Sequence, residues 1–473
     1  MKEVKLVLIN LEEDKEHPAM GLISIATYLE NNGFNNTTII DRCFEDVPAR
    51  IAELNPTVVG ISSKTVHYAL AMETAQQIRE RFPNIMLIVG GPHITTLPPS
   101  LKVFDFGVIG EGEETVLEII KSLEKDKLDL SKIKGLVYNK NNKICITEPR
   151  PPIMPLDSIP SPNLKYVNPK FIREMNSGFG LGKRGFIITS RGCPFRCLYC
   201  STTRVWSKLR FNSPERIVHD IKDWVEKYGV TQIRVMDDLF VISVERMLEI
   251  EQLMEKEGLM GKVGFIVSAR ANVLNEELCK ICKRIGVKKM NFGFDSGNER
   301  VLKMLKGDAM SVSYIKSAVE LCEKYGILME GSFIFASPTE TIAEMEDTLS
   351  IIKWMARKKN VDSVWTFVMT PLPATPIWDI AEKRGKVSTN MNWRDLSYYR
   401  EHDPLVLDAD YDEFRELWTR VKTELKVFKW HRIQKMILTD PLYLIKKSFA
   451  KPKLLFNLIF YRRVVDQENI KEK

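Results

Sequence analysis

The stretch RGCPFRCLYC, residues 191–200, carries the most specific pattern in this 473-residue chain. It sets Cys193, Cys197 and Cys200 in a C-x3-C-x2-C spacing directly after 186–189, an apolar run typical of a strand. Three thiolates in one loop can hold three corners of a cubane iron–sulfur cluster and leave one iron open for an external chelator. A structural zinc site needs a fourth ligand, and residues 201–208 contain no Cys or His. The spacing therefore predicts a cluster-binding loop.

The cysteine loop follows the first of six strand-like runs that alternate with helical patterns. Parallel strands within residues 186–369 favour a partial (β/α)6 barrel over a closed eightfold one, and the chemistry of such barrels lies at the carboxyl ends of the strands. The six expected strands are Phe186–Thr189, Gln232–Met236, Val263–Val267, Val287–Phe294, Leu328–Phe335 and Ser363–Met369.

The first 125 residues show a second set of apolar strands separated by helices. Fully apolar strands of this kind indicate a parallel sheet covered on both faces, so an α/β, Rossmann-like, doubly wound domain is expected. A helix is expected over Pro18–Asn32, with Gly33 just after its end. The five expected strands are Lys5–Asn10, Thr37–Ile40, Thr57–Ile61, Ile85–Val89 and Phe106–Ile109.

Glycines and hydroxyls follow the strands of this first domain. Because the carboxyl ends of parallel strands meet at one edge of the sheet, they predict a ligand-binding edge, although each glycine could also simply permit a tight turn. None of the segments matches the G-x-G-x-x-G dinucleotide fingerprint. The candidate residues are Ser62, Ser63, Gly90, Gly91, His93, Gly110, Glu111 and Gly112.

The order of these patterns divides the chain into four segments. Residues 1–130 form the first domain, and residues 131–181 form a hairpin followed by a Pro-rich linker, with six prolines between Pro149 and Pro162. The barrel occupies residues 182–395, and residues 396–473 are expected to form a helical, basic C-terminal region. Cys279 and Cys282 form a C-x2-C pair inside an expected helix, where core packing is favoured over metal binding.

The net charge of +7 is concentrated near the C-terminus, where residues 420–463 hold twelve Lys and Arg against two Asp and Glu. The remaining chain is slightly acidic, so nucleic-acid binding is not expected. No signal peptide or membrane-spanning run is predicted, and eight cysteines in a chain of this length favour a reducing, cytoplasmic location. Apolar groups flanked by Lys and Arg in residues 427–463 either pack on the barrel or form interfacial helices that contact a membrane.

Residues 182–378 resemble the radical S-adenosylmethionine (SAM) superfamily, whose signature is the C-x3-C-x-aromatic-C loop. The resemblance implies that the three cysteines bind a [4Fe–4S] cluster, that SAM chelates its open iron, and that cleavage of SAM yields a 5′-deoxyadenosyl radical. It also implies that a reductant such as flavodoxin or ferredoxin supplies the electron. The implied SAM contacts are Tyr199 near the adenine, Asp237 and Asp238 near the amino group, Arg270 near the carboxylate, and Asp295 and Ser296 near the ribose.

Two departures from the superfamily pattern stand in these segments. Asp295 replaces the usual Glu and is one methylene shorter, and Ala336 and Thr339 stand where glycines are more common.

Residues 4–123 resemble the cobalamin-binding domains of a branch that includes anaerobic Mg-protoporphyrin ester cyclases and hopanoid methylases. The resemblance implies that the glycine and serine edge binds cobalamin. The Asp-x-His-x-x-Gly motif that supplies a lower cobalt ligand in other cobalamin domains is absent, so His93 is expected to contact the corrin tail or the fold. His17 and His67 are expected at the surface or in packing.

These patterns favour a radical SAM enzyme that transfers a methyl group from methylcobalamin to an unactivated carbon. Radical cyclisation, oxidation or rearrangement on the same scaffold is the alternative reaction. A different class of function, in which the Rossmann-like half is a docking module without cobalamin, stays open. An interfacial tail would favour a lipid or isoprenoid substrate over another small molecule.

Overall fold

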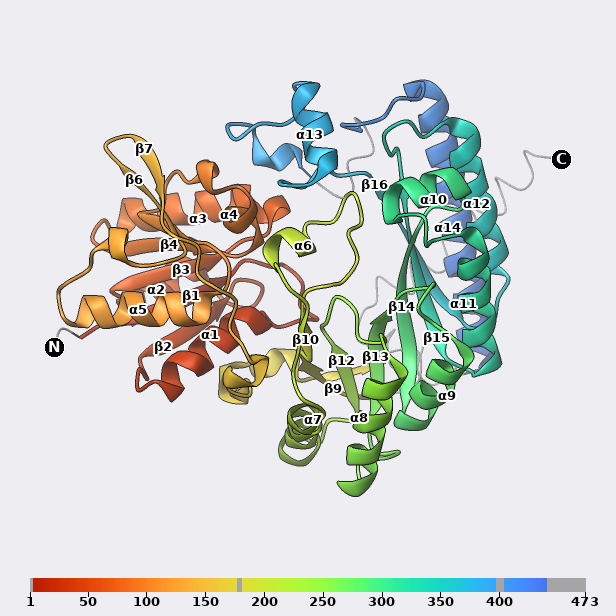
Figure 1. The fold of residues 1–473 in the computed structure, drawn as a ribbon, viewed down its shortest axis with the longest axis horizontal. Helices are drawn as coiled ribbons and strands as arrows, with labels where there is room; N and C mark the ends of the chain where they lie inside the picture. Colours follow the sequence, from red (N-terminus) through yellow and green to blue (C-terminus); the bar gives the residue numbers. More distant parts are fainter. Residues whose placement is uncertain (1–2, 177–180, 397–403, 440–473) are drawn as a thin grey trace.

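The computed structural model describes residues 3–176, 181–396 and 404–439, and Figure 1 shows two sheets that form two neighbouring halves of the molecule. The first sheet contains seven strands in the order β2-β1-β3-β4-β5-β6-β7. The second contains seven strands in the order β16-β15-β14-β13-β12-β9-β8. Both sheets are parallel at their centres, which confirms the expected α/β class.

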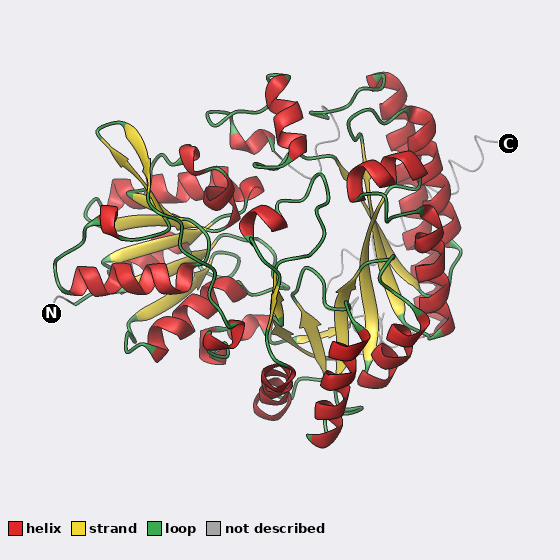
Figure 2. Cartoon of the chain, viewed as in Figure 1, coloured by secondary structure: helices red, strands yellow, loops and turns green. Residues whose placement is uncertain are grey.

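The five parallel strands of the first sheet are buried because helices cover both of its faces (Figure 2). Alternate residues of each strand enter two separate apolar clusters, as the twofold side-chain period of a strand requires. One cluster lies under α1 and α5, and the other under α2 and α3. These elements are β1 (Leu6–Asn10), β2 (Thr37–Asp41), β3 (Val58–Ser62), β4 (Met86–Gly90), β5 (Phe106–Val108), α1 (Met20–Asn31), α2 (Val47–Leu54), α3 (Tyr68–Arg81), α4 (Pro92–Thr96) and α5 (Gly112–Glu124).

The segment 131–181 contributes strands to both sheets. The hairpin β6 (Leu136–Lys140) and β7 (Lys143–Ile146) pairs antiparallel with β5 and extends the first sheet beyond residue 130. At the other end of the segment, β8 (Glu174–Asn176) pairs antiparallel with β9 and ends the second sheet. The hairpin therefore belongs to the first sheet, and the Pro-rich stretch that follows runs from one half of the molecule to the other.

Six parallel strands of the second sheet form the partial barrel, and their helices pack on its outer face (Figure 1). Ser213 caps the start of α7 and Gly229, in the left-handed conformation, ends it, as the sequence pattern of this helix requires. The elements are β9 (Leu181–Ile187), β12 (Gln232–Val235), β13 (Gly264–Ala269), β14 (Val287–Asp295), β15 (Leu328–Phe335), β16 (Val361–Val368), α7 (Pro214–Tyr228), α8 (Val244–Lys256), α9 (Glu276–Ile285), α10 (Glu299–Lys306), α11 (Val312–Lys324) and α12 (Ile342–Ala356).

The C-terminal region returns to both halves of the molecule. After α13 (Pro376–Lys383), Trp393 packs into the first domain, and α14 (Tyr411–Thr439) then lies along α12. Phe428 is buried in the barrel core, and Arg432 pairs with Asp362. The first part of the expected basic tail therefore packs on the barrel. The later apolar groups, in residues 442–460, lie outside the described residues, and no helix within the described ranges is long and apolar enough to cross a membrane.

Candidate active site

The three cysteines lie in one half-buried loop after β9, at the carboxyl edge of the barrel. Gly192 precedes them at φ +97°, and a side chain there would meet the carbonyl oxygen of Lys208 at 2.8 Å, so the start of the loop needs glycine. The backbone N–H of Leu198 donates to the Leu305 carbonyl at 2.8 Å and ties the loop to the end of α10. The loop is therefore held at both ends by backbone packing.

Burial raises the pKa of the Cys193 and Cys200 thiols, and the nearby charge of Asp238 and of the other cysteines raises it further. Cluster assembly must therefore displace protons from these thiols, since thiolates are the ligands of iron. No three His, Cys, Asp or Glu side chains within the described ranges converge as ligands of a single metal ion. In a cubane cluster each thiolate binds its own iron, so a soft donor set of three cysteines in one loop fits the cluster.

Arg270 follows β13 and contacts the cysteine loop directly. Its guanidinium donates to Cys197 Sγ at 3.2 Å, stacks on the ring of Phe195 at 3.9 Å, and donates to the Lys306 carbonyl at 3.1 Å. A cation at this position offsets the negative charge that three thiolates bring to a cluster. The structure thus places Arg270 beside the cluster loop, and its predicted contact with the SAM carboxylate stays a prediction.

Tyr199 and Asp295, both predicted to contact SAM, are hydrogen-bonded to each other. The Tyr199 hydroxyl donates to Asp295 Oδ2 at 2.6 Å, and Lys306 Nζ lies 2.7 Å from the same carboxylate. Burial raises the pKa of Tyr199 well above its ordinary value, and the charge of Asp295 adds to this effect. Asn291, on the same strand, carries a buried amide oxygen that accepts no hydrogen bond from the described residues. Asn291 lies four residues before Asp295 on β14, and its unmet acceptor fits a polar ligand in the barrel.

The two adjacent acidic residues after β12 have different partners. Asp237 is buried and accepts hydrogen bonds from the Thr189 backbone and from the Thr189 and Ser190 hydroxyls, and burial raises its pKa to about 6. Asp238 accepts from Thr202 Oγ1 at 3.2 Å, and it is the member of the pair whose charge acts on the cysteine thiols. Asp237 therefore holds the strand that leads to the loop, whereas Asp238 borders the loop itself.

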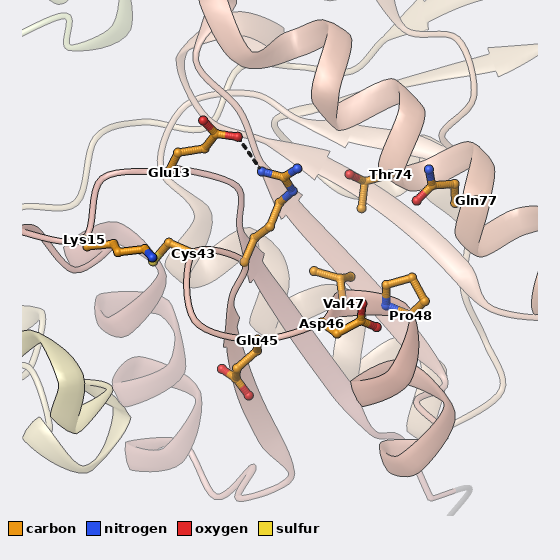
Figure 3. Close-up of a pocket in the computed structure, with 10 residues that line it drawn as sticks. Glu13, Lys15, Cys43, Glu45, Asp46, Val47, Pro48, Thr74 and Gln77 are labelled. Carbon is orange, nitrogen blue, oxygen red and sulfur yellow. Dashed lines mark hydrogen bonds and ion pairs between the residues drawn. The ribbon is translucent and has the colours of Figure 1, made fainter. Parts of the chain in front are cut away.

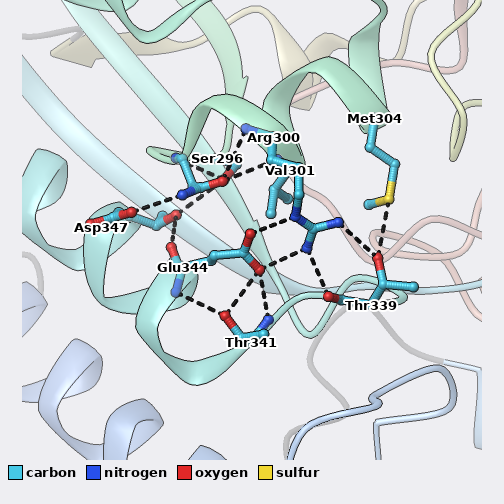
Figure 4. Close-up of polar contacts among 10 residues, drawn as sticks. Ser296, Arg300, Val301, Met304, Thr339, Thr341, Glu344 and Asp347 are labelled. Atoms are coloured by element: carbon cyan, nitrogen blue, oxygen red, sulfur yellow. Dashed lines mark hydrogen bonds and ion pairs between the residues drawn. The ribbon is translucent and has the colours of Figure 1, made fainter.

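Ser296 lies just before Asn298, which is the N-cap of α10. Its buried Oγ accepts from the backbone N–H of Asn298 at 3.1 Å and contacts Thr348 Oγ1 at 3.3 Å, at the start of α10 (Figure 4). Nearby, Arg300 of α10 pairs with Glu344 and donates to the Thr339 carbonyl. These contacts position the segments after β14 and β15, while direct contact between Ser296 and a ribose stays a prediction.

The glycine edge of the first domain combines tight packing with open space. Gly91 has φ +93° and ψ −174°, and a Cβ there would lie 2.9 Å from the Ser63 carbonyl oxygen and 3.1 Å from Ser62 Oγ. By contrast, a Cβ at Gly90 or Gly110 would meet nothing within 4 Å. Two glycines beside open space at the carboxyl edge of a parallel sheet fit a large ligand such as cobalamin.

His93 is fully buried and belongs to the core of the first domain. Its ring stacks on Tyr68 with centroids 3.8 Å apart and meets Trp393 edge-on at 4.6 Å. Its nitrogens face Thr65 Oγ1 at 3.2 Å and Ser100 Oγ at 2.9 Å, and burial lowers its pKa to about 3. The neighbours of His93 belong to the fold, which is one of the two expectations for this residue, while its contact with the corrin tail stays a prediction. The His93 imidazole is therefore not a candidate for the lower ligand of cobalt.

Glu111, predicted to bind cofactor, joins the two domains in the structure. Its carboxylate lies 3.0 Å from Arg191 and 2.6 Å from Arg210, and it also accepts the Ile153 backbone N–H. Glu113 is the second partner of Arg191, so the residue two positions before Cys193 is held by two carboxylates of the first domain. Gly112 starts α5 beside Ile25, where a Cβ would lie only 2.6 Å away. A cofactor contact by Glu111 or Gly112 stays a prediction.

An open cavity of about 570 Å³ lies at the carboxyl ends of β1 and β2 (Figure 3). Its wall is mostly charged and polar, and Glu13 pairs with Arg42 at 2.8 Å across it. Cys43 is part of the same wall, and burial raises the pKa of its thiol. This cavity lies at the same edge of the sheet as the glycine segments but beside other strands.

Comparison with known proteins places this geometry in a family. Residues 187–352 match the radical SAM superfamily, and residues 5–120 match the B12 binding domain. An uncharacterized methyltransferase of Pyrococcus horikoshii is 31% identical over 82% of this chain and 83% of its own length. The chain belongs to the radical SAM superfamily and carries a B12-binding domain. This cobalamin-dependent radical SAM enzyme therefore uses a [4Fe–4S] cluster, SAM and cobalamin.

Two further relatives place the enzyme more broadly. The anaerobic magnesium-protoporphyrin IX monomethyl ester cyclase of Rubrivivax gelatinosus is 26% identical over 87% of this chain and 73% of its own length. The solved structure of the cobalamin-dependent SAM radical enzyme OxsB, with aqua-cobalamin and SAM bound, covers 99% of this chain and 80% of its own. Its TM-score is 0.69 at 16% identity, which supports the fold. The B12-domain match favours a cobalamin-binding half over a docking module.

Sequence reasoning did not identify Lys306, Arg191 or Arg210 as site residues. Lys306 lies at the end of a helix, and only the packing of α10 against β14 brings it to Asp295. Arg191 adjoins the cysteine motif, so its position was a usable signal, but its carboxylate partners are about eighty residues away in another domain. No local spacing encodes such a pair.

Proposed function

We propose that this enzyme transfers a methyl group from cobalamin to an unactivated carbon of its substrate. The observation that carries the proposal is the similarity to the Pyrococcus horikoshii methyltransferase, which extends over both domains. The ion pairs of Arg191 support it, because they fix the cobalamin-binding domain against the loop that holds the cluster. When bound, the cluster and SAM supply a substrate radical, and cobalamin supplies the methyl group.

The residues of the chain hold and shield these groups. The three cysteines provide the thiolates, and Arg270 offsets part of their charge. Tyr199, whose hydroxyl bonds to Asp295, places a half-buried ring at the end of the loop. Partial burial of the loop limits the access of water, which protects a radical from quenching.

Radical cyclisation or oxidation is the second candidate, and the similarity to the anaerobic cyclase favours it. The two reactions differ in product mass. We expect anaerobically reconstituted enzyme, given SAM, a flavodoxin or ferredoxin reductant and an extract of cells that lack the gene, to produce a species heavier by one methylene. With SAM labelled by deuterium on its methyl group, the product should carry the label. An unlabelled product, or one lighter by two hydrogens, would contradict methyl transfer.

We also propose that the substrate is a lipid or isoprenoid, and that the basic tail brings the enzyme to a membrane surface. The support is the alternation of apolar and basic groups in residues 442–463. Each Lys or Arg near an anionic leaflet contributes about 1 kcal/mol, so several together give weak, reversible binding. Because Phe428 and Arg432 pack on the barrel, the tail must be removed after them to test its role.

Sedimentation with liposomes provides this test. The full-length protein should pellet with vesicles that contain anionic lipid at low salt, and a chain ending at Thr439 should stay in the supernatant. Both proteins should stay in the supernatant with neutral vesicles. Equal sedimentation of the two proteins with anionic vesicles would remove the tail as a membrane element and would remove the argument for a lipid substrate.

A further inference from the structure

The side chain of Arg234, on β12, lies on the inner face of the barrel. On β12, Ile233 and Val235 enter the apolar core under the helices, so the intervening Arg234 lies on the opposite, inner face. Arg184 of β9 shares this face, because it pairs in register with Gln232, two residues before Arg234. Two neighbouring strands therefore bring two guanidinium groups to one wall of the barrel.

Arg234 lacks the partners that a sheltered guanidinium usually has. Within the part of the chain that the structure describes, no carboxylate, carbonyl or hydroxyl group accepts a hydrogen bond from it. Burial lowers the pKa of Arg234, although the charges of Glu330, Glu16 and Asp14 act in the opposite direction. Glu330 is already engaged by Lys289 and by Ser363 Oγ at 2.6 Å. Arg234 is thus a half-buried cation whose hydrogen-bond donors remain available.

The opposite wall of the barrel carries two aromatic side chains in addition to the polar pair Glu330 and Ser363. On β16, Val364 and Val368 face the helices, so Trp365 and Phe367 lie on the inner face, where Phe367 pairs in register with Ile334 of β15. Trp365 is 46% exposed, which is unusual for a large aromatic side chain in a strand of a barrel. An exposed indole on the inner face provides a surface on which an apolar group can pack.

We propose that Arg234 binds an anionic group of the substrate, a phosphate or a carboxylate, while Trp365 packs against an apolar part of the same molecule. Guanidinium groups bind both anions through paired N–H donors, and a sheltered site makes these bonds strong. Arg234 lies close to the carboxyl end of β12, just before the segment with Asp237 and Asp238. A substrate held there by its anionic end presents its apolar part to the edge where the cluster loop lies. This inference rests on the proposed function only in placing the substrate inside the barrel.

Equilibrium dialysis of the anaerobic holoenzyme against three radiolabelled ten-carbon probes tests the inference. Decyl phosphate and decanoate carry the two anions, and decanol is the neutral counterpart. At least one anion should bind tenfold or more tightly than decanol, and the preferred one identifies the group. Arg234→Gln should weaken that anion by about tenfold to a hundredfold and leave decanol unchanged, because a charge-assisted hydrogen bond is lost. Trp365→Ala should weaken all three probes.

Arg357→Gln, at an exposed position after α12, is the matched control and should bind every probe as the wild-type enzyme does. The urea midpoint provides a second measurement, since removal of a cation without a partner should leave it unchanged or raise it. A lower midpoint for Arg234→Gln would show a structural ion pair and overturn the inference. Equal binding of decanol and both anions would also overturn it. None of these results depends on turnover, so product mass tests methyl transfer separately.

Discussion

Among the contacts between the two domains, we expect the loss of the Arg191 contact to destabilise the protein most. Its guanidinium reaches Glu111 and Glu113 of the first domain and lies 3.1 Å from Ser24 Oγ, while its side chain is only 10% exposed. Arg191→Gln removes the cation and leaves the Glu113 carboxylate, which is 3% exposed, with the Ser24 hydroxyl as its hydrogen-bond donor. Removing one partner of a buried ion pair costs about 3–5 kcal/mol, so the free energy of unfolding should fall by that amount.

Arg394→Gln is the matched control for this change. Arg394 also bridges the two halves of the molecule, through Glu73, but its side chain is 69% exposed and that of Glu73 is 42% exposed. An exposed pair contributes about 0–1 kcal/mol, so this variant should unfold nearly as the wild-type protein does. Urea unfolding of both variants, followed by circular dichroism and by the visible absorption of the cluster, measures the difference. Equal losses would refute the argument that burial makes the Arg191 contact important.

The pH dependence of the same contact follows from Glu111. Burial raises the pKa of this carboxyl, but the hydrogen bonds and charges of Arg210 and Arg191 outweigh burial and leave its pKa lowered. A carboxyl with a lowered folded-state pKa stabilises the protein above its unfolded-state pKa, and this contribution is lost as the pH falls through the folded-state value. Arg191→Gln should therefore lower the free energy of unfolding near neutral pH. It should also make that free energy fall less steeply as the pH drops.

Three other changes give separate tests. Gly91→Ala and Gly307→Ala both force alanine into a region of positive φ, with ψ near 180°, at a cost of about 1–3 kcal/mol each, but only Gly91 also meets the Ser63 backbone. Gly91→Ala should therefore lower the unfolding midpoint more than Gly307→Ala does. It should also weaken cobalamin binding in a titration, whereas Gly307→Ala should leave this binding intact. Equal cobalamin affinities of the two variants would contradict the prediction that the glycine edge of the first domain binds cobalamin. The pKa of about 3 for His93 lies below its unfolded-state value near 6.5, so the stability of the first domain should fall as the pH drops from 6.5 toward 3, by about 1.4 kcal/mol per unit. His93→Gln should flatten that slope, and an unchanged slope would exclude His93 as its cause. Tyr199→Phe removes the hydroxyl that holds Asp295 and should weaken SAM binding in equilibrium dialysis while the iron content stays the same; a loss of iron would instead assign Tyr199 a structural role.

The sequence predicted the central strands of the first sheet because their residues are almost wholly apolar. β1 is buried along its whole length and lies within one residue of the predicted run, because a strand covered on both faces holds mainly apolar residues. β15 matches its predicted run as well, although it contains Glu330 and Ser332 and alternates buried with half-buried positions. The sequence predicts the hairpin that precedes the Pro-rich linker but not its place in the first sheet, because pairing with β5 is a long-range contact that the residues of the hairpin do not encode. Cys279 and Cys282 are buried in the core, as their place in a helix predicted.

The candidate site was predictable to the extent that its residues share one short motif. The cysteine spacing identified the loop, and Asp238, Arg270 and Tyr199 lie beside it. The partners of Asp237 and Ser296 were not predictable, because a carboxylate or hydroxyl at a strand end is equally able to face a ligand or to hold the backbone. Arg234 has no motif at all, and its inward direction emerges only when the core residues on either side of it are known.

The iron, sulfide and cobalt content of anaerobically purified protein, measured together with the reductive cleavage of SAM, tests the central claim most directly. Wild-type protein should contain about four irons and four sulfides and should bind cobalamin, and with dithionite it should convert SAM to 5′-deoxyadenosine. The variant with Cys193, Cys197 and Cys200 all changed to Ala should lose the cluster and the cleavage and should retain cobalamin. Cleavage of SAM by the triple variant, or absence of cobalt from the wild-type protein, would contradict the account.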